Sequence, residues 1–471
     1  RSIWVTGVQT CALPICAGLT VAVCSTALAG NPFKGLTTTE GGYHTWDSDL
    51  INVEAVPQTG HGVYVAVLDT GMVPNWRDYF PEARVAVQLG TGFDQPVSFR
   101  ASKNNPCGIE VEVGRLQQTT WVGSTGSTHG THVASTILGY NYYSNFDAAG
   151  GFPLPPVQVR GIAPDVTVIP VKVLSDYQIP ALPKCTDPGP QPSTKAVFGT
   201  SAMVAAGIRY ATDLKRAGYS PMVINMSLGG SALEQVEQDA LDYAIANGVI
   251  VVAAAGNEGE TGMGYPGAYA PVISAGAIGW TEEWLKPTDG LPRYRMWWLK
   301  DSDHVPPLLP GSGEVADPTQ ASDIYVTDFS SRELPGQELD VLAPGSWVRG
   351  PFPGSPGFNH LPWWSKGIGD VAGGHNAGNF FYVGGTSMAT PHISAVAAMM
   401  MQKNPNLTQA QVEGILKSTT LPLAASGSRD IFDFDHAATI TWDTDCDGTP
   451  CDAVGAGVVR ADAALSATPA P

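Results

Sequence analysis

The stretch VYVAVLDTG (Val63–Gly71) indicates the fold class of the whole chain. Its first six residues are apolar or aromatic and show no polar alternation, which is typical of a strand buried on both faces. Four further runs share this pattern: 166–174, 222–228, 249–255 and 272–278. Strands of this kind belong to a parallel sheet that helices cover on both faces. The chain is therefore predicted to be an α/β protein.

Helical segments lie between these runs. One follows Thr200 and Ser201, which are candidate N-caps, and ends at Gly218; others are expected over 232–248 and 407–419. The alternation of strands and helices predicts one domain with a mostly parallel sheet. Three proline-, glycine- or tryptophan-rich segments interrupt it, and we interpret 175–199, 280–328 and 350–379 as long loops on that domain.

The composition limits the classes of partner. The chain has 471 residues, 43% of them hydrophobic, and its 43 acidic against 25 basic residues give a net charge of −18. A charge of this sign argues against nucleic acid or an anionic membrane surface as partner. No apolar run reaches the roughly 18 residues that a membrane-spanning helix needs. The acidity fits an extracellular protein, and simple solubility explains it equally well.

The N-terminal region is set apart from the fold. VTGVQTCALPI (Val5–Ile15) resembles the translation of a sequencing-library adapter, so residues 1–15 are interpreted as an assembly artefact. Residues 16–29 resemble the end of a secretory signal with an A-x-A cleavage site at Ala27–Ala29, although a buried strand is the alternative. A lead-in over 30–51, the main domain over 52–466 and a short tail over 467–471 complete the predicted organisation. We expect an extracellular location, with the periplasm as the alternative.

The cysteines support an oxidising compartment. Without the three N-terminal ones, four of the seven remain, which suits two disulfides: Cys107, Cys185, Cys446 and Cys451. Three pairings are open. We favour Cys446–Cys451, which are close in sequence, and hence Cys107–Cys185, whose longer loop predicts a stabilisation of about 4 kcal/mol.

Four polar residues stand where open α/β sheets place their sites, at strand ends or helix starts. They are Asp69, His129, Asn257 and Ser387. Serine is a weak nucleophile unless an imidazole accepts its proton, and a carboxylate is needed to hold that imidazole in the right tautomer. Taken singly, each of the four is better explained as a cap or a core polar residue; together they suggest nucleophilic catalysis.

The segments around these residues carry a specific resemblance. VAVLDTG, HGTHVAS, AAAGNEG and GTSMATPH resemble, in this order, the four signature blocks of the subtilisin family of serine peptidases. The resemblance spans about 52–465 and implies a three-layer fold. It also implies Ser387 as nucleophile, His129 as general base and acid, Asp69 as the group orienting it, and Asn257 with the Ser387 N–H as oxyanion hole.

The same resemblance implies how a polypeptide substrate binds. The substrate would lie extended along Ser227, Leu228 and Gly229, and the first specificity pocket would be formed by Ala254, Ala255, Gly256 and, at its floor, Gly264. Small residues leave an open, apolar slot, so we expect broad specificity with a preference for a large hydrophobic residue before the cut. Glu258 and Glu260 at the rim would also admit Lys or Arg.

No cofactor is expected for catalysis, but the resemblance implies a structural calcium at Asp78. The segment Asp443–Gly448 resembles the start of an EF-hand loop, yet Val454 stands where the twelfth, acidic ligand belongs. We interpret it as a disulfide-clamped turn with at most weak affinity for calcium.

The stretch GGTSMATPHISAVAAMM (Gly384–Met400) predicts a buried helix with Pro391 near its start. We place Pro391 in the first turn, where an N–H has no partner inside the helix and a proline costs little. Ser387 would then lie at the positive end of the helix dipole.

The predicted function is that of a secreted serine endopeptidase. A catalytically inactive binding protein with the same fold is the first alternative. A nucleotide-binding α/β protein is the second, but DTGMVP after the first strand is not a glycine-rich phosphate loop. The sequence predicts no oligomeric state.

Overall fold

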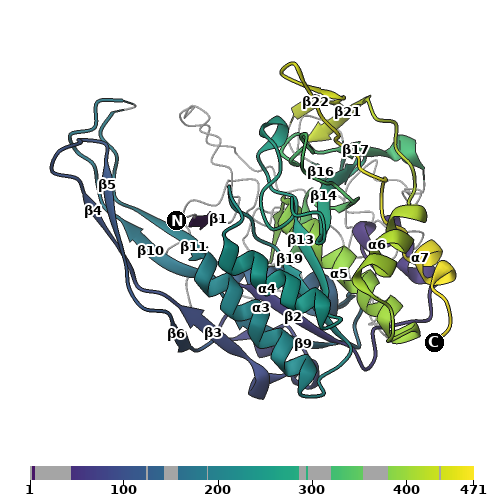
Figure 1. Ribbon diagram of the computed structural model, residues 1–471. Helices are drawn as coiled ribbons and strands as arrows, with labels where there is room; N and C mark the ends of the chain where they lie inside the picture. Colours follow the sequence, from purple (N-terminus) through teal and green to yellow (C-terminus); the bar gives the residue numbers. More distant parts are fainter. Residues whose placement is uncertain are drawn as a thin grey trace, which may run out of the picture.

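The central feature of the computed structural model is a nine-stranded sheet (Figure 1). The structure describes residues 3–5, 44–123, 126–142, 157–187, 189–285, 293–294, 320–353, 380–433 and 436–471. The strand order is β17 (Ile324–Val326), β14 (Ile273–Trp280), β13 (Ile250–Ala254), β12 (Met222–Met226), β2 (Tyr64–Asp69), β9 (Thr167–Lys172), β3 (Thr91–Asp94) and β6 (Gln117–Thr119), and β18 (Val341–Pro344) also pairs with β14. All five predicted strands are present.

The sheet is mostly parallel, as predicted, with antiparallel pairs only at β14–β17 and β3–β6 among its described strands. Its central strands β2, β9, β12, β13 and β14 are buried on both faces. In β2, Val65 and Val67 enter one hydrophobic core, and Ala66 and Leu68 enter the other. This alternation explains why the run from Val63 shows no polar residue before Asp69.

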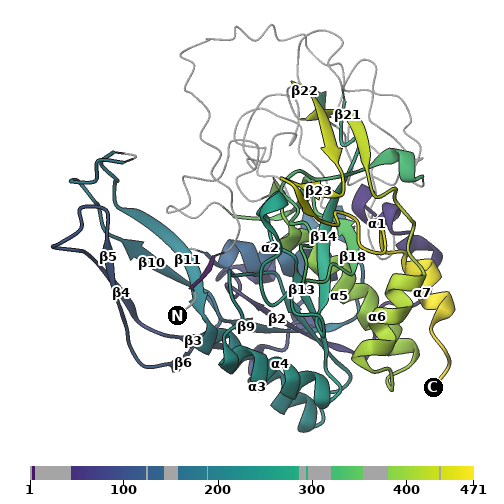
Figure 2. The ribbon, with the colours of Figure 1, turned by 45° about the horizontal axis from the view of Figure 1, so that its top comes forward.

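Helices cover both faces of the sheet, which makes three layers. On one face α3 and α4 pack beside each other. Helices α2 and α5 pack on the opposite face (Figures 1 and 2). The bounds are α1 (Trp46–Leu50), α2 (Ser127–Leu138), α3 (Ser201–Arg216), α4 (Gln235–Ala246), α5 (Thr386–Lys403), α6 (Gln409–Ser418) and α7 (Ala461–Ala467). The Thr200 hydroxyl caps α3 by accepting from Met203 N, as the sequence predicts. Within the described ranges, none of the helices combines the length and apolar character needed to cross a membrane.

The prediction of a loop without regular structure over 175–199 is corrected in one respect, because this segment contains a β-hairpin. Strands β10 (Ser175–Ile179) and β11 (Thr194–Thr200) pair antiparallel. The side chains of Tyr177 and Phe198 stack at a centroid distance of 4.2 Å, which gives the two strands an apolar contact. The prolines that suggested a loop are confined to the connection between the strands.

The remaining strands pair outside the nine-stranded sheet. They are β4 (Val97–Ala101) with β5 (Ile109–Val113), β7 (Gly139–Tyr142) with β8 (Val157–Arg160), β15 (Trp284–Leu285) with β16 (Arg293–Tyr294), β19 (Val348–Pro351) with β20 (Phe380–Val383), β21 (Gly427–Asp433) with β22 (His436–Trp442), β23 (Asp445–Cys446) with β24 (Thr449–Pro450), and β1 (Ile3–Val5), which pairs with β11. Apart from β1, the predicted artefact and signal segments lie outside the described residues. The same holds for most of the predicted loops over 280–328 and 350–379.

Candidate active site

The loop after β2 is fastened to the first turn of α2 by side chains that bond to backbone groups. Thr70 Oγ1 accepts from the N–H of Gly130 at 2.9 Å, and Ser127 Oγ donates to the carbonyl oxygen of Thr70 at 2.9 Å. A Cβ at Gly130 would lie 2.3 Å from the carbonyl oxygen of Gly71, so only glycine permits this approach. The residues around DTG and HGTH therefore bring the end of β2 against the start of α2.

This contact places Asp69 beside His129. The distance from Asp69 Oδ1 to His129 Nδ1 is 2.8 Å, and Asp69 is completely buried. The same oxygen accepts from the N–H of Thr70 at 2.6 Å. Because a carboxylate accepts hydrogen bonds, His129 Nδ1 carries the hydrogen and Nε2 is left to take up a proton.

Ser387 lies in the first turn of α5, which begins at Thr386. The N-cap Gly385 has φ of 152° and donates its N–H to the carbonyl oxygen of Gly345 at 2.7 Å. Helices α2 and α5 pack against each other, so the histidine and the serine project from neighbouring helices. The N-terminal position gives Ser387 the positive end of the dipole of a buried helix.

Pro391 is not in the first turn of α5, which corrects the prediction. It is the sixth residue of the helix, where its missing N–H leaves the carbonyl oxygen of Ser387 without a partner inside the helix. The hydroxyl of Ser227 donates to this oxygen instead, at 2.7 Å. Asn225 Nδ2 donates in turn to Ser227 Oγ at 3.1 Å. Ser227 was predicted only to bind substrate, and its contact with the serine backbone was missed because the two residues are far apart in sequence.

The amide of Asn257 is oriented by Thr386, which the sequence reasoning also missed. Asn257 Oδ1 accepts from Thr386 N at 2.8 Å and from Thr386 Oγ1 at 3.0 Å. A backbone N–H can only donate, so the oxygen of the amide must face Thr386. Asn257 Nδ2 then faces away from Thr386 N, and both atoms of the amide lie 3.7 Å from the position that a Cβ on Gly385 would occupy. An amide donor thus stands at the N-terminus of α5.

The side chains of Ser387 and His129 are not joined in this conformation. Ser387 is 4% exposed, and its Oγ donates to the carbonyl oxygen of Ser227 at 3.3 Å. Among the described residues, no hydrogen bond connects it to His129. Catalytic hydrogen bonds are often long or poorly aligned until a substrate is bound.

The three segments predicted to bind substrate lie beside one another. Ser227, Leu228 and Gly229 follow β12, and the backbones of Gly230 and Tyr265 exchange hydrogen bonds of 2.9 and 2.8 Å. Gly264 N donates to the carbonyl oxygen of Ala255 at 2.8 Å, which joins this pair to the 254–256 segment after β13. Leu228 is 2% exposed and its side chain belongs to a core, so only its backbone can contact a ligand.

Glu258 lies at the edge of these segments. Its Oε2 is 2.3 Å from the position of a Cβ on Gly256 and accepts from Ser331 Oγ at 3.0 Å. The side chain is exposed. A negative charge therefore stands directly beside the wall of the predicted specificity pocket.

The predicted metal ligand Asp78 is exposed, and its Oδ2 accepts from Asn75 Nδ2 at 3.0 Å. It belongs to neither of the two groups of metal-ligating side chains that gather in the described part of the chain, His44–Asp49–Glu54 and Glu338–Asp340–Glu413. In the second group a lysine takes the place of a cation, because Lys417 Nζ lies 2.6 Å from Glu338 and 2.9 Å from Asp340. Asp78 is thus not part of a cluster of three such side chains among the described residues, and residues 143–156 of the loop predicted to share in the site lie outside them.

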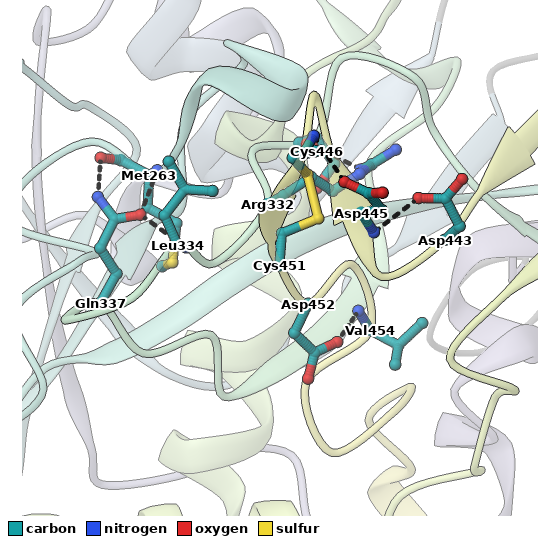
Figure 3. Close-up of a disulfide and its surroundings, with 12 residues drawn as sticks. Met263, Arg332, Leu334, Gln337, Asp443, Asp445, Cys446, Cys451, Asp452 and Val454 are labelled. Carbon is teal, nitrogen blue, oxygen red and sulfur yellow. Dashed lines mark hydrogen bonds between the residues drawn. A yellow bond between two sulfur atoms is a disulfide. The ribbon is translucent and has the colours of Figure 1, made fainter.

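Two disulfides join cysteines of the described residues. Cys446–Cys451 closes the turn between β23 and β24 (Figure 3). In that turn Asp443 Oδ1 accepts from Asp445 N at 2.9 Å, and Asp445 Oδ1 accepts from Gly448 N at 2.7 Å. These carboxylates thus bond to the turn's own backbone. Cys107–Cys185 joins the β4–β5 hairpin to the connection between β10 and β11.

Comparison with known proteins gives consistent matches. The model of the subtilase family matches residues 60–446. Subtilisin E of Bacillus subtilis (strain 168) is 28% identical over 372 residues, which is 78% of this chain and 63% of that protein. Fervidolysin of Fervidobacterium pennivorans is 26% identical over 445 residues, 92% of this chain and 46% of that protein. The crystal structure of fervidolysin matches with a TM-score of 0.51 at 24% identity, over 91% of this chain and 46% of that one, which shows the same fold. The chain thus spans less than two thirds of the length of either relative.

Proposed function

Because the chain belongs to the subtilase family of serine peptidases, we propose that it hydrolyses peptide bonds as a serine endopeptidase with Asp69, His129, Ser387 and Asn257 as its catalytic residues. The observation that carries the proposal is the buried 2.8 Å contact between Asp69 Oδ1 and His129 Nδ1 on the helix that packs against α5. It leaves His129 Nε2 as an acceptor next to the helix that carries Ser387.

In the first step His129 Nε2 accepts the hydroxyl proton of Ser387 while Oγ attacks the carbonyl carbon of the substrate. The imidazolium that forms is stabilised by the Asp69 carboxylate. Asn257 Nδ2 and the N–H of Ser387 donate to the oxygen as it becomes negative. His129 then gives the proton to the leaving amine, and an acyl-enzyme remains. A water molecule then gives a proton to His129 Nε2 while its oxygen attacks the acyl carbon. His129 returns a proton to Ser387 Oγ as the ester bond breaks and the acid leaves.

The substrate would bind as an extended strand along the backbone of Ser227, Leu228 and Gly229. The residue before the cut would lie against Ala254, Ala255, Gly256 and Gly264. These small residues support a preference for large hydrophobic side chains. The position of Glu258 beside Gly256 supports acceptance of Lys or Arg as well. A panel of chromogenic peptides tests this, and strict cleavage after paired basic residues would contradict it.

We further propose that the protein is exported. Two disulfides support this, since they persist in oxidising compartments. No cofactor is needed for the chemistry derived above. A structural calcium at Asp78 stays a prediction. If a chelator leaves the melting temperature of the protein unchanged, this prediction is contradicted.

The decisive experiment is labelling with a fluorophosphonate, followed by identification of the cleavage sites in an unfolded protein. We expect one label on Ser387 and none on the Ser387→Ala variant. If the protein is folded and binds peptides but takes up no label, the alternative of a catalytically inactive binding protein is favoured instead.

A further inference from the structure

His392 is buried on the helix that carries the proposed nucleophile, and the chemistry derived above does not use it. It follows Ser387 by five residues and has no exposed surface. Its Nδ1 lies 2.8 Å from the carbonyl oxygen of Met388, and its Nε2 lies 3.0 Å from Asp47 Oδ2 on α1. Each ring nitrogen of a buried imidazole thus has a polar partner, which offsets the cost of burying it.

These partners fix the charge of His392. A carbonyl oxygen can only accept, so Nδ1 carries a hydrogen and donates it to Met388. One proton must also lie between Nε2 and Asp47 Oδ2, since two lone pairs would otherwise face each other at 3.0 Å. An imidazole is a stronger base than a carboxylate, so this proton resides on Nε2. His392 is therefore an imidazolium that forms a buried ion pair with the carboxylate of Asp47.

The ion pair acts on the first turn of α5. The carbonyl oxygens of Ser387 and Met388 follow each other in the chain, and both accept hydrogen bonds from side chains. Ser227 donates to the first of them, which lacks a partner because of Pro391, and His392 donates to the second. The backbone on the carboxyl side of the proposed nucleophile is thus held by two side chains.

Helix α1 gives Asp47 a fixed position. The ring of Trp46 stacks on that of Trp280 in β14 at a centroid distance of 6.2 Å, and both side chains are buried. The carbonyl oxygen of Ile51, directly after α1, accepts from the N–H of Ala461 in α7 at 2.8 Å. Helix α1 is therefore anchored to the central sheet and to α7 by contacts that do not involve α5. The ion pair joins this anchored helix to the helix of Ser387.

We propose that Asp47 and His392 are positioning residues that hold Ser387 in the orientation needed for attack. The inference rests on the proposed endopeptidase function and adds two residues to it. In the described part of the chain, neither forms a hydrogen bond to His129 or to the predicted substrate segments. To react, Ser387 Oγ must turn from the carbonyl oxygen of Ser227 toward His129 Nε2. A displacement of about 1 Å in a reacting group can lower a rate by about 10²-fold, so a fixed backbone matters here.

The first test compares Asp47→Ala with Asp47→Asn in the steady-state hydrolysis of a chromogenic peptide. Alanine removes the partner of Nε2, and we expect kcat to fall by about 10–100-fold while KM changes by less than about twofold. Asparagine can still bond to Nε2, so its kcat should stay within about threefold of that of the unaltered protein. Equal losses for the two variants, or an unchanged kcat for Asp47→Ala, would overturn the inference.

Ser48→Ala is the matched control, because Ser48 belongs to the same short helix and is 1% exposed. Its hydroxyl donates to the carbonyl oxygen of Thr45 at 2.8 Å and accepts from Thr45 N at 3.0 Å. The substitution therefore weakens the start of α1 without removing the ion pair. It should lower the melting temperature and leave kcat unchanged. If it lowers kcat as much as Asp47→Ala does, α1 has a purely structural role and the inference fails.

A double-mutant cycle tests whether the two residues act together. His392→Gln should lower kcat about as much as Asp47→Ala, and it should add little to the loss in the Asp47→Ala background. If the two losses multiply instead, the residues act independently and the proposed pair is wrong.

A spectrum tests the charge of His392 without relying on cleavage or on any variant of Asp47. With ¹⁵N-labelled histidine at pH 7, the unaltered protein should show a histidine whose two ring nitrogens both carry hydrogen, and this signal should be absent from His392→Gln. A missing signal overturns the ion pair even where Asp47→Ala does not fold. A protein that gives the signal but cleaves no peptide would contradict the endopeptidase proposal itself.

Discussion

Ser227 donates a hydrogen bond of 2.7 Å to the carbonyl oxygen of Ser387, across 160 residues of sequence. That oxygen needs an outside donor because Pro391, four residues later, has no N–H. The bond holds the backbone of the proposed nucleophile, and it explains how a proline is tolerated inside a buried helix. The residue that was expected to bind substrate therefore also completes the helix that carries the serine.

This relationship predicts a coupling between the two positions. Ser227→Ala leaves a buried carbonyl unpaired and should lower the free energy of unfolding by about 1–3 kcal/mol. In a Pro391→Ala background the new N–H can bond to Ser387, so the same substitution should cost measurably less. Urea unfolding of the four proteins measures the difference. Equal costs in the two backgrounds would show that Ser227 does not replace the missing donor.

Asp69→Asn should reduce kcat by about 10⁴-fold with little change in KM, because an amide can donate to Nδ1 and stabilise the wrong tautomer of His129. The measurement is steady-state hydrolysis of a chromogenic peptide. A matched circular dichroism spectrum shows that the fold is kept. A loss of less than tenfold would remove Asp69 from the proposed catalytic group.

Asn257→Ala should lower kcat by about 10²–10³-fold by removing one donor to the developing oxyanion. Thr386→Val removes the hydroxyl, which contacts Asn257 Oδ1 at 3.0 Å and the N–H and carbonyl oxygen of Gly256 at 3.2 and 3.1 Å. The variant keeps the backbone N–H that orients Asn257, and the amide donor stays in place, so a smaller loss is expected. The kcat of Asn257→Ala should therefore be lower than the kcat of Thr386→Val. The reverse ranking would mean that Thr386 and not Asn257 is the more important group.

Glu283 predicts a pH dependence of stability. Burial raises the pKa of its carboxyl from 4.5 to about 8, although Trp280 N and Ser346 Oγ donate to it at 2.8 and 3.0 Å. Between these values the folded protein holds a proton that the unfolded chain has lost. Stability is therefore fully present below about pH 4.5 and falls as the pH rises to 8, by up to about 1.4 kcal/mol per pH unit from this group. Glu283→Gln should flatten that part of the curve in urea unfolding at a series of pH values, and an unchanged slope would contradict the assignment.

Glu237 lies on the inward face of α4 with no exposed surface, and no described residue forms a hydrogen bond with its carboxylate oxygens. Burial raises the pKa of this carboxyl well above its usual value. Glu237→Leu removes the cost of burying an unpaired polar group and should stabilise the protein by about 1–3 kcal/mol at pH 7. Thermal unfolding measures the change. Glu234→Leu, on the neighbouring surface, serves as the comparison and should show no such gain.

Several features follow from the sequence alone: the parallel sheet, its three layers and the placement of Asp69, His129, Asn257 and Ser387 at element ends. These features are local, because the period of hydrophobic residues and the capping residues are written in consecutive positions. Val63–Asp69 shows this, since both of its faces had to be apolar to be buried.

The contacts between distant segments, by contrast, depend on how the chain packs in three dimensions. The pairing of Tyr177 with Phe198, the support of Ser387 by Ser227 and the orientation of Asn257 by Thr386 all join residues whose neighbours in sequence do not reveal the partner. Pro391 is the clearest case. Its position near the helix start is visible in the sequence, but the fate of the carbonyl it leaves unpaired depends on which strand end packs against the helix. The absence of the N–H at Pro391 can be read from the local sequence. The group that donates to the Ser387 carbonyl oxygen instead depends on which residues pack against the helix in three dimensions.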